Sequence, residues 1–116
     1  MVNDDVDLEA FEGEQEGVEC TQQLIRASGV DALRRLLPVA QNGTGQSRVV
    51  ARFLLGLYNG RRFPFDLTDF RLLDLPLFLD CLAVLKMDSR PEKEVHEFIE
   101  GGSAIWEKMA KVWGSQ

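Results

Sequence analysis

The chain has 116 residues, which is enough for one domain that buries its own core without metals or disulfides. No apolar run reaches the length of a membrane span, and the acidic start predicts neither a secretory signal nor a transit peptide, so we expect a cytoplasmic protein. The net charge of −6 is unevenly distributed: residues 1–20 hold eight acids and no base, residues 21–62 seven bases and one acid, and residues 63–116 ten acids and six bases.

The first 17 residues are predicted to form a flexible acidic tail, because their like charges repel and few of their side chains are apolar. After them, no run of alternating β-branched residues indicates a strand, and apolar residues recur at three- and four-residue steps. We therefore expect residues 18–116 to form a single helical domain.

Two helical stretches are expected before the first glycine-rich turn. The first covers about 18–27, and the second begins at Gly29 and continues to about residue 41. Pro38 lies late in the second stretch and predicts a kink, and Asn42 with Gly43 predicts its end. The apolar face of the second stretch consists of Leu33, Leu36, Leu37 and Ala40.

A bounded helix is predicted between Thr44 and Tyr58. Thr44 is a good N-cap, Ser47 can support the first turn, and apolar residues repeat at helical spacing after them. Asn59 followed by Gly60 is typical of a left-handed C-cap.

The next helices are predicted from their caps and apolar content. Asp66 and Asp74 match N-caps, and the run from Phe70 to Met87 is apolar on nearly all faces, which favours the most buried helix of a bundle. Ser89 and Glu92 match a capping box that would open a helix ending at the Gly101–Gly102 pair. Ser103 would cap a last helix. The predicted core consists of Phe53, Leu54, Leu57, Phe78, Leu82, Leu85, Phe98 and Ile99.

Together these elements predict an all-α fold, a compact bundle of five or six short helices with an acidic N-terminal tail. The chemistry of an enzyme is missing from the sequence. The Gly-x-Gly at 43–45 lacks a preceding strand and a third glycine, so it does not match a nucleotide loop. His96 stands alone among glutamates, as a solvated histidine does, and Cys81 lies in an apolar helix, as an inert core thiol does. Because Cys20 and Cys81 are far apart and no metal-ligand spacing occurs, we expect free thiols, no metal and no cofactor.

Arginines concentrate between residues 26 and 62 and would form one basic face if the two helices of this region pack antiparallel. Three interpretations stay open: acids from residues 66–116 neutralise this face, it meets an acidic protein surface or the acidic tail, or it meets a nucleic-acid backbone. The acidic total and the lack of base-reading side chains favour a protein partner over a nucleic acid. The candidate contact residues are Arg34, Arg35, Arg48, Arg52, Arg61 and Arg62.

The last helix carries both tryptophans of the chain. Trp106, Met109 and Trp113 share one face, which is typical of core packing and, as the alternative, of an interface with a partner or with a second copy in a homodimer.

Two segments resemble a family of small uncharacterised bacterial proteins, many of them encoded near plasmid or integrative-element genes. The segments are "DALRRLLPVAQNGTGQSRVVARFLLGLYNG" and "FDLTDFRLLDLPLFLDCLAVLKM", and the resemblance covers about residues 30–88. Its most specific pieces are residues 44–48 and 65–67. The resemblance implies a bacterial cytoplasm and a link to mobile elements, and it supplies no activity.

The sequence therefore predicts a small non-enzymatic binding or adaptor module that uses the basic face and the terminal helix. The alternative is an accessory or regulatory protein that binds nucleic acid.

Overall fold

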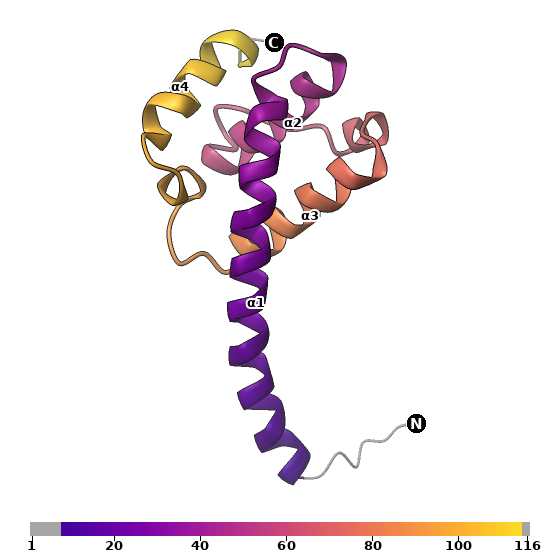
Figure 1. Ribbon diagram of the computed structural model, residues 1–116, viewed down its shortest axis with the longest axis vertical. Coiled ribbons are helices and arrows are strands. Elements are labelled where there is room, and N and C mark those ends of the chain that lie inside the picture. The colour runs from indigo at the N-terminus through magenta and orange to yellow at the C-terminus, as the bar shows by residue number, and fades with distance from the viewer. Residues whose placement is uncertain (1–7, 115–116) are drawn as a thin grey trace.

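The computed structural model describes residues 8–114 of the chain, with side chains described from residue 21 onward. Across this range the chain is helical and has no strand, which confirms the all-α prediction (Figure 1). The elements are α1 (Leu8–Ala40), α2 (Gly45–Tyr58), the 3-10 segment η1 (Leu67–Leu72), α3 (Leu75–Ser89), the 3-10 segment η2 (Val95–Phe98) and α4 (Gly102–Trp113). The predicted acidic tail falls on residues 1–7, which are outside the described range, and on the first turns of α1, whose side chains are outside it too.

Helix α1 is one continuous helix of 33 residues, so the prediction of two stretches before residue 41 is wrong. Gly29 lies inside the helix because α3 crosses α1 there: a Cβ atom at Gly29 would lie 2.5 Å from Cβ of Met87 and 3.1 Å from the carbonyl oxygen of Ala83. The glycine therefore permits a close helix crossing and does not end a helix. Pro38 lies within the last turn, and the helix ends two residues later, at Ala40.

The N-terminal half of α1 projects away from the other helices, whereas its C-terminal half packs into them (Figure 1). Helices α1 and α3 form the most extensive pairing, and α2 lies against α1, α3, α4 and both 3-10 segments. The folded body is thus built around α2 and the second half of α1. The buried residues that α1 contributes are Ala32, Leu33, Leu36, Leu37 and Ala40.

Helix α2 begins as the sequence predicted. The Thr44 hydroxyl accepts from the Ser47 backbone N–H at 3.3 Å, and Ser47 Oγ accepts from the Thr44 backbone N–H at 2.9 Å, which completes a capping box. The predicted left-handed C-cap is wrong, because Asn59 has an extended backbone with a φ of −157°. Its side-chain oxygen instead accepts from the backbone N–H groups of Arg61 and Arg62 and fixes the turn that follows.

Helix α3 is positioned by its cap and by a side chain of α2. Asp74 accepts from the Leu77 N–H at 3.0 Å, which confirms the predicted cap. Gln46 accepts from the Asp74 N–H at 2.7 Å, so the first turn of α2 also anchors the start of α3. Asp66 caps η1 in the same way by accepting from Thr68, and these hydrogen bonds lower the pKa of the Asp66 carboxyl.

The prediction that α3 is the most buried helix is wrong. Only Cys81, Val84 and Met87 of this helix are buried, whereas α2 buries seven residues. The outward side of α3 has no neighbouring element in the described part of the chain that covers its leucines: Leu75 is 64% exposed and Leu79 is 51% exposed.

The predicted capping box at Ser89 and Glu92 does not form. Ser89 belongs to the last turn of α3, where its hydroxyl donates to the carbonyl oxygen of Lys86 at 2.7 Å. The following segment is only the short η2, and its capping box is made by Glu94 and Glu97. The chain then turns through Gly101, whose φ is +70°, into α4.

The core joins α1, α2, α3 and α4, and the predicted core list is correct only in part. Phe53 and Leu54 are buried, and Leu57, Phe98 and Ile99 are half-buried and pack against the core. Phe78 and Leu82 are half-buried, and Leu85 is 40% exposed. The last three belong to α3, so the errors share one cause, the position of α3 at the surface.

Candidate interaction surfaces

Arginines of residues 26–62 are paired with acids of the second half of the chain. Arg35 makes a bidentate pair with Asp80 on α3, with Nε to Oδ2 at 3.1 Å and Nη2 to Oδ1 at 2.8 Å, and this contact raises the pKa of Arg35. Arg48 lies 3.8 Å from Asp69 on η1. Arg26 lies 3.5 Å from Glu92. The paired acids lie on η1, on α3 and in the segment after α3, so these ion pairs connect α1 and α2 to three different parts of the fold.

Arg62 belongs to a three-residue cluster with Tyr58 and Glu107. Tyr58 Oη donates to Glu107 Oε2 at 2.7 Å, and Arg62 donates to both carboxylate oxygens at 3.0 and 3.3 Å. The guanidinium of Arg62, and then the Tyr58 hydroxyl, lower the pKa of the Glu107 carboxyl. The hydrogen bond to Glu107 raises the pKa of the Tyr58 hydroxyl. The cluster ties the end of α2 to α4.

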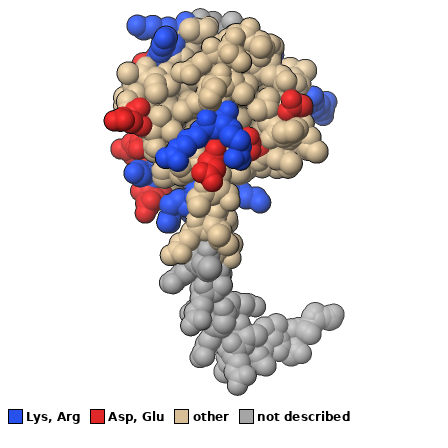
Figure 2. All heavy atoms as spheres, viewed as in Figure 1, with Lys and Arg blue, Asp and Glu red and all other residues tan. Residues whose placement is uncertain are grey.

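The remaining candidate arginines are Arg34, Arg52 and Arg61, and no acid of the described part of the chain lies within ion-pair distance of them. Arg34 and Arg61 are exposed, and Arg52 is half-buried beside Arg62 in a small hollow next to Trp113. On the face drawn in Figure 2, basic and acidic groups lie side by side in small clusters, and wide uncharged areas separate these clusters. Of the candidate contact arginines, Arg52 and Arg62 line one hollow together.

The terminal helix contributes two core residues and one surface residue. Trp106 is fully buried, and its indole N–H donates to the carbonyl oxygen of Leu54 at 3.1 Å. Met109 is 3% exposed. Both are therefore core residues, and of the three candidate interface residues only the half-buried Trp113 can contact a partner.

An apolar surface that was not among the predicted sites lies on η1 and α3. Leu75, Leu79 and Leu82 are spaced three or four residues apart, so they share the face of α3 that points outward, and we call these three residues the outer leucine face. Leu72, just before α3, is 56% exposed. A shallow hollow of about 190 Å³ lies between α2, η1 and α3, and its lining includes Leu67 and Leu85. The signal for this surface was present in the sequence as a helix that is apolar on all sides.

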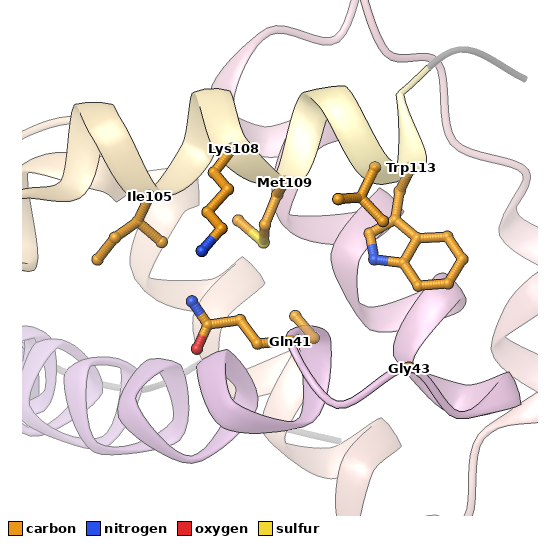
Figure 3. Close-up of a pocket in the computed structure, with 8 residues that line it drawn as sticks. Gln41, Gly43, Ile105, Lys108, Met109 and Trp113 are labelled. Carbon is orange, nitrogen blue, oxygen red and sulfur yellow. The ribbon is translucent and has the colours of Figure 1, made fainter.

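A second pocket lies between the end of α1 and α4 (Figure 3). It has a volume of about 350 Å³ and is lined by Ala40, Gln41, Gly43, Ile105, Lys108, Met109, Val112 and Trp113. Most of these groups are apolar, and Lys108 and Gln41 supply the polar atoms. Of the three candidate interface residues, Met109 and Trp113 line this pocket and Trp106 does not.

The side chains of Cys81 and His96 both pack into the folded body. Burial, with a smaller contribution from Asp80, raises the pKa of the Cys81 thiol to about 12, so this free cysteine is an inert core residue as predicted. His96 is not the solvated residue that was predicted, because its ring packs edge-on against Tyr58 with 5.0 Å between ring centroids and its Nδ1 is buried without a hydrogen-bond partner among the described residues.

The described residues contain no cluster of three metal-ligating side chains. No helix in the described range is long and apolar enough to cross a membrane.

Comparison with known families identifies the chain. Residues 30–114 match DUF7673, a family of unknown function, and because the match spans well over half of the sequence the chain belongs to that family. The match includes α4, which the resemblance seen in the sequence had left outside, and it begins near the point where α1 enters the folded body. No curated protein and no solved structure matches the chain.

Proposed function

We propose that this member of DUF7673 is a small non-enzymatic binding module whose outer leucine face receives a basic amphipathic helix of a protein partner. The bacterial cytoplasm and the link to mobile elements that the sequence resemblance implies belong to the same proposal. The observation that supports it best is the exposure of Leu75 and Leu79, at 64% and 51%, on a helix that is apolar on all sides.

Apolar residues all around a helix are expected where all sides are buried. In α3 the inner side packs against α1 and α2, and the outer side has no cover in the described part of the chain. Adjacent exposed leucines that form a continuous apolar patch are typical of interaction sites, whereas single exposed leucines need no explanation. The exposed Leu72 and the hollow lined by Leu67 and Leu85 add further apolar surface on η1 and α3.

The charges near the outer leucine face indicate the kind of partner. The segment 66–88 contains five aspartates and two basic residues, Arg71 and Lys86. Asp69 and Asp80 are paired with Arg48 and Arg35, so Asp66, Asp74 and Asp88 supply the negative charge that remains for a partner. A partner helix with leucines on one side and lysines or arginines on its flanks would match both the apolar face and the acidic border. A second copy would bring the same acidic border against itself in a symmetric dimer, which disfavours self-association through this face.

The basic face remains a competing hypothesis for a polyanion. It loses support because Arg35, Arg48 and Arg62 are already paired with acids of the same chain. A polyanion would have to separate these pairs or depend on Arg34, Arg52 and Arg61 alone. Binding to duplex DNA in the experiment described next would therefore support this competing hypothesis.

The test uses a fluorescently labelled amphipathic peptide of leucine and lysine and measures its anisotropy with the full chain. We expect saturable binding, and we expect the double variant Leu75→Ser/Leu79→Ser to bind at least about tenfold more weakly, which corresponds to about 1.4 kcal/mol. Leu24→Ser is the matched control, because Leu24 is 63% exposed but lies on α1, and it should leave binding unchanged.

Two further probes separate binding to this face from general attraction between opposite charges. A peptide of identical composition in scrambled order and an amphipathic peptide of leucine and glutamate should both bind more weakly than the leucine–lysine peptide. Equal binding of the scrambled peptide, unchanged binding by the double variant, or retention of duplex DNA in place of the peptide would each contradict the proposal. A dimer that the double variant dissociates in sedimentation experiments would assign the face to a second copy.

A further inference from the structure

The pocket between α1 and α4 has the dimensions and lining of a small-molecule site. Its volume of about 350 Å³ falls within the usual range of ligand pockets, roughly 300–1,000 Å³. Ile105, Met109 and Trp113 project from α4 toward the end of α1 and form an apolar wall (Figure 3). Val112, another lining residue, is 58% exposed and would lose contact with water if the pocket were filled.

Two exposed polar side chains border this apolar space. Figure 3 shows the Lys108 ammonium group and the side-chain amide nitrogen of Gln41 pointing toward one another across the pocket. The first comes from α4 and the second from the residue after α1. Both side chains are exposed, and no acid in the part of the chain that the structure describes lies within ion-pair distance of Lys108.

Both side chains can donate to one acceptor on a bound ligand, and an ammonium group favours an acceptor with a negative charge. A carboxylate would accept from both donors while an attached hydrocarbon chain lay along Ile105, Met109 and Trp113. We propose that this pocket binds a medium-chain carboxylate, such as a fatty acid, with its head group between Lys108 and Gln41 and its chain against α4. This site is separate from the outer leucine face and does not depend on the proposed partner.

A simpler role for Lys108 makes a different prediction. The last carbonyl groups of α1 carry a partial negative charge, and a nearby lysine could do no more than balance it. In that case the pocket would have no preference for a carboxylate, and removal of the lysine would affect stability and not binding. The two roles are therefore distinguished by ligands that differ only in their head groups.

Octanoate, octanol and octylamine provide that comparison when each is titrated below its micelle concentration. We expect octanoate to change the fluorescence of Trp113 in a saturable way, and we expect the other two probes to bind at least about tenfold more weakly. Trp113→Phe should remove the fluorescence change, because Trp106 is buried away from solvent. Calorimetry gives the affinity of each variant without relying on tryptophan.

Lys108→Met and Lys111→Met form a matched pair on the same helix. Both remove one positive charge, but only Lys108 lines the pocket. We expect Lys108→Met to weaken the binding of octanoate at least about tenfold and to change the affinity for octanol by no more than about twofold. We expect Lys111→Met to have little effect on either affinity. The double variant Leu75→Ser/Leu79→Ser should bind octanoate as the wild type does, so that failure of this proposal and failure of the proposed function remain distinguishable.

The proposal is overturned if no probe binds, if octylamine binds as tightly as octanoate, or if both lysine variants lose octanoate equally. N-acetylleucine is a further probe, because it carries the carboxylate and the apolar side chain of a peptide that ends in leucine. Tighter binding of N-acetylleucine than of octanoate would assign the pocket to a peptide terminus and would overturn the fatty-acid assignment.

Discussion

Helix α2 carries two arginines and buries seven residues, whereas α3 is more apolar and buries three. The two helices have nearly the same length, 14 and 15 residues. The difference lies in their neighbours: α2 packs against every other element of the folded body, and α3 packs mainly against α1. Burial in this fold thus follows the number of neighbouring elements, and the apolar surface that α3 has in excess stays exposed.

The largest effect is expected from truncation of α2. Leu54 is fully buried and accepts, through its backbone, the indole N–H of Trp106. Leu54→Ala should lower the free energy of unfolding by about 2–5 kcal/mol, because it removes buried methyl groups and leaves a cavity. Chemical denaturation followed by circular dichroism measures this loss, and a value below about 1 kcal/mol would mean that α2 is not the centre of the core.

The next effect concerns the inner side of α3. Gly29→Ala would place a Cβ atom 2.5 Å from Cβ of Met87 and would push α3 away from α1, at a cost of about 1–3 kcal/mol. Gly45→Ala is the control, since a Cβ atom there meets nothing within 4 Å. If both variants were equally stable, the close crossing of α1 and α3 would be wrong.

A smaller effect is expected from the cluster that joins α2 to α4. Arg62 and Tyr58 hold the pKa of Glu107 below its ordinary value of 4.5, so the unfolded chain binds the proton more readily than the folded one. The stability that this carboxylate contributes is present above pH 4.5 and is lost as the pH falls through the lowered pKa. Denaturation curves of wild type and Glu107→Gln should therefore differ near neutral pH and converge in acid, and a constant difference would contradict this origin.

The smallest effect on stability is expected at the outer leucine face. Leu75→Ser/Leu79→Ser should change the free energy of unfolding by no more than about 0.5 kcal/mol, because both side chains are already largely in water. The same variant should lose the leucine–lysine peptide. A loss of stability comparable to that of Leu54→Ala would show that the face is buried in solution.

Local signals in the sequence predicted the local features of the fold. The caps at Thr44, Asp66 and Asp74 were confirmed because each depends on a side chain and a backbone group only a few residues apart. The predicted capping box at Ser89 was wrong because Ser89 is the last residue of α3, where its hydroxyl donates to the carbonyl oxygen of Lys86. Gly29 looked like a boundary, since only the position of α3 shows that this glycine is needed for a close approach.

The candidate sites depended on contacts between distant segments and were therefore harder to predict. Charge counts showed that arginines concentrate in residues 26–62, but nothing in them showed that Arg35 would meet Asp80, 45 positions away. The apolar run of α3 was interpreted as a buried helix because periodicity cannot tell whether a chain has enough neighbours to cover all sides. Lys108 and Gln41 carried no pattern at all, and only the packing of α4 near the end of α1 brings them together.

Methyl-labelled leucine NMR during titration with the leucine–lysine peptide tests the central claim most directly. The method observes the outer leucine face of α3 and the buried leucines of α1 and α2 in one experiment. We predict that the methyl resonances of Leu75 and Leu79 shift strongly and saturably, while those of the buried Leu36 and Leu54 change little. Shifts confined to residues near Arg34 and Arg52, or no shifts at Leu75 and Leu79, would contradict the assignment of this face to a protein partner.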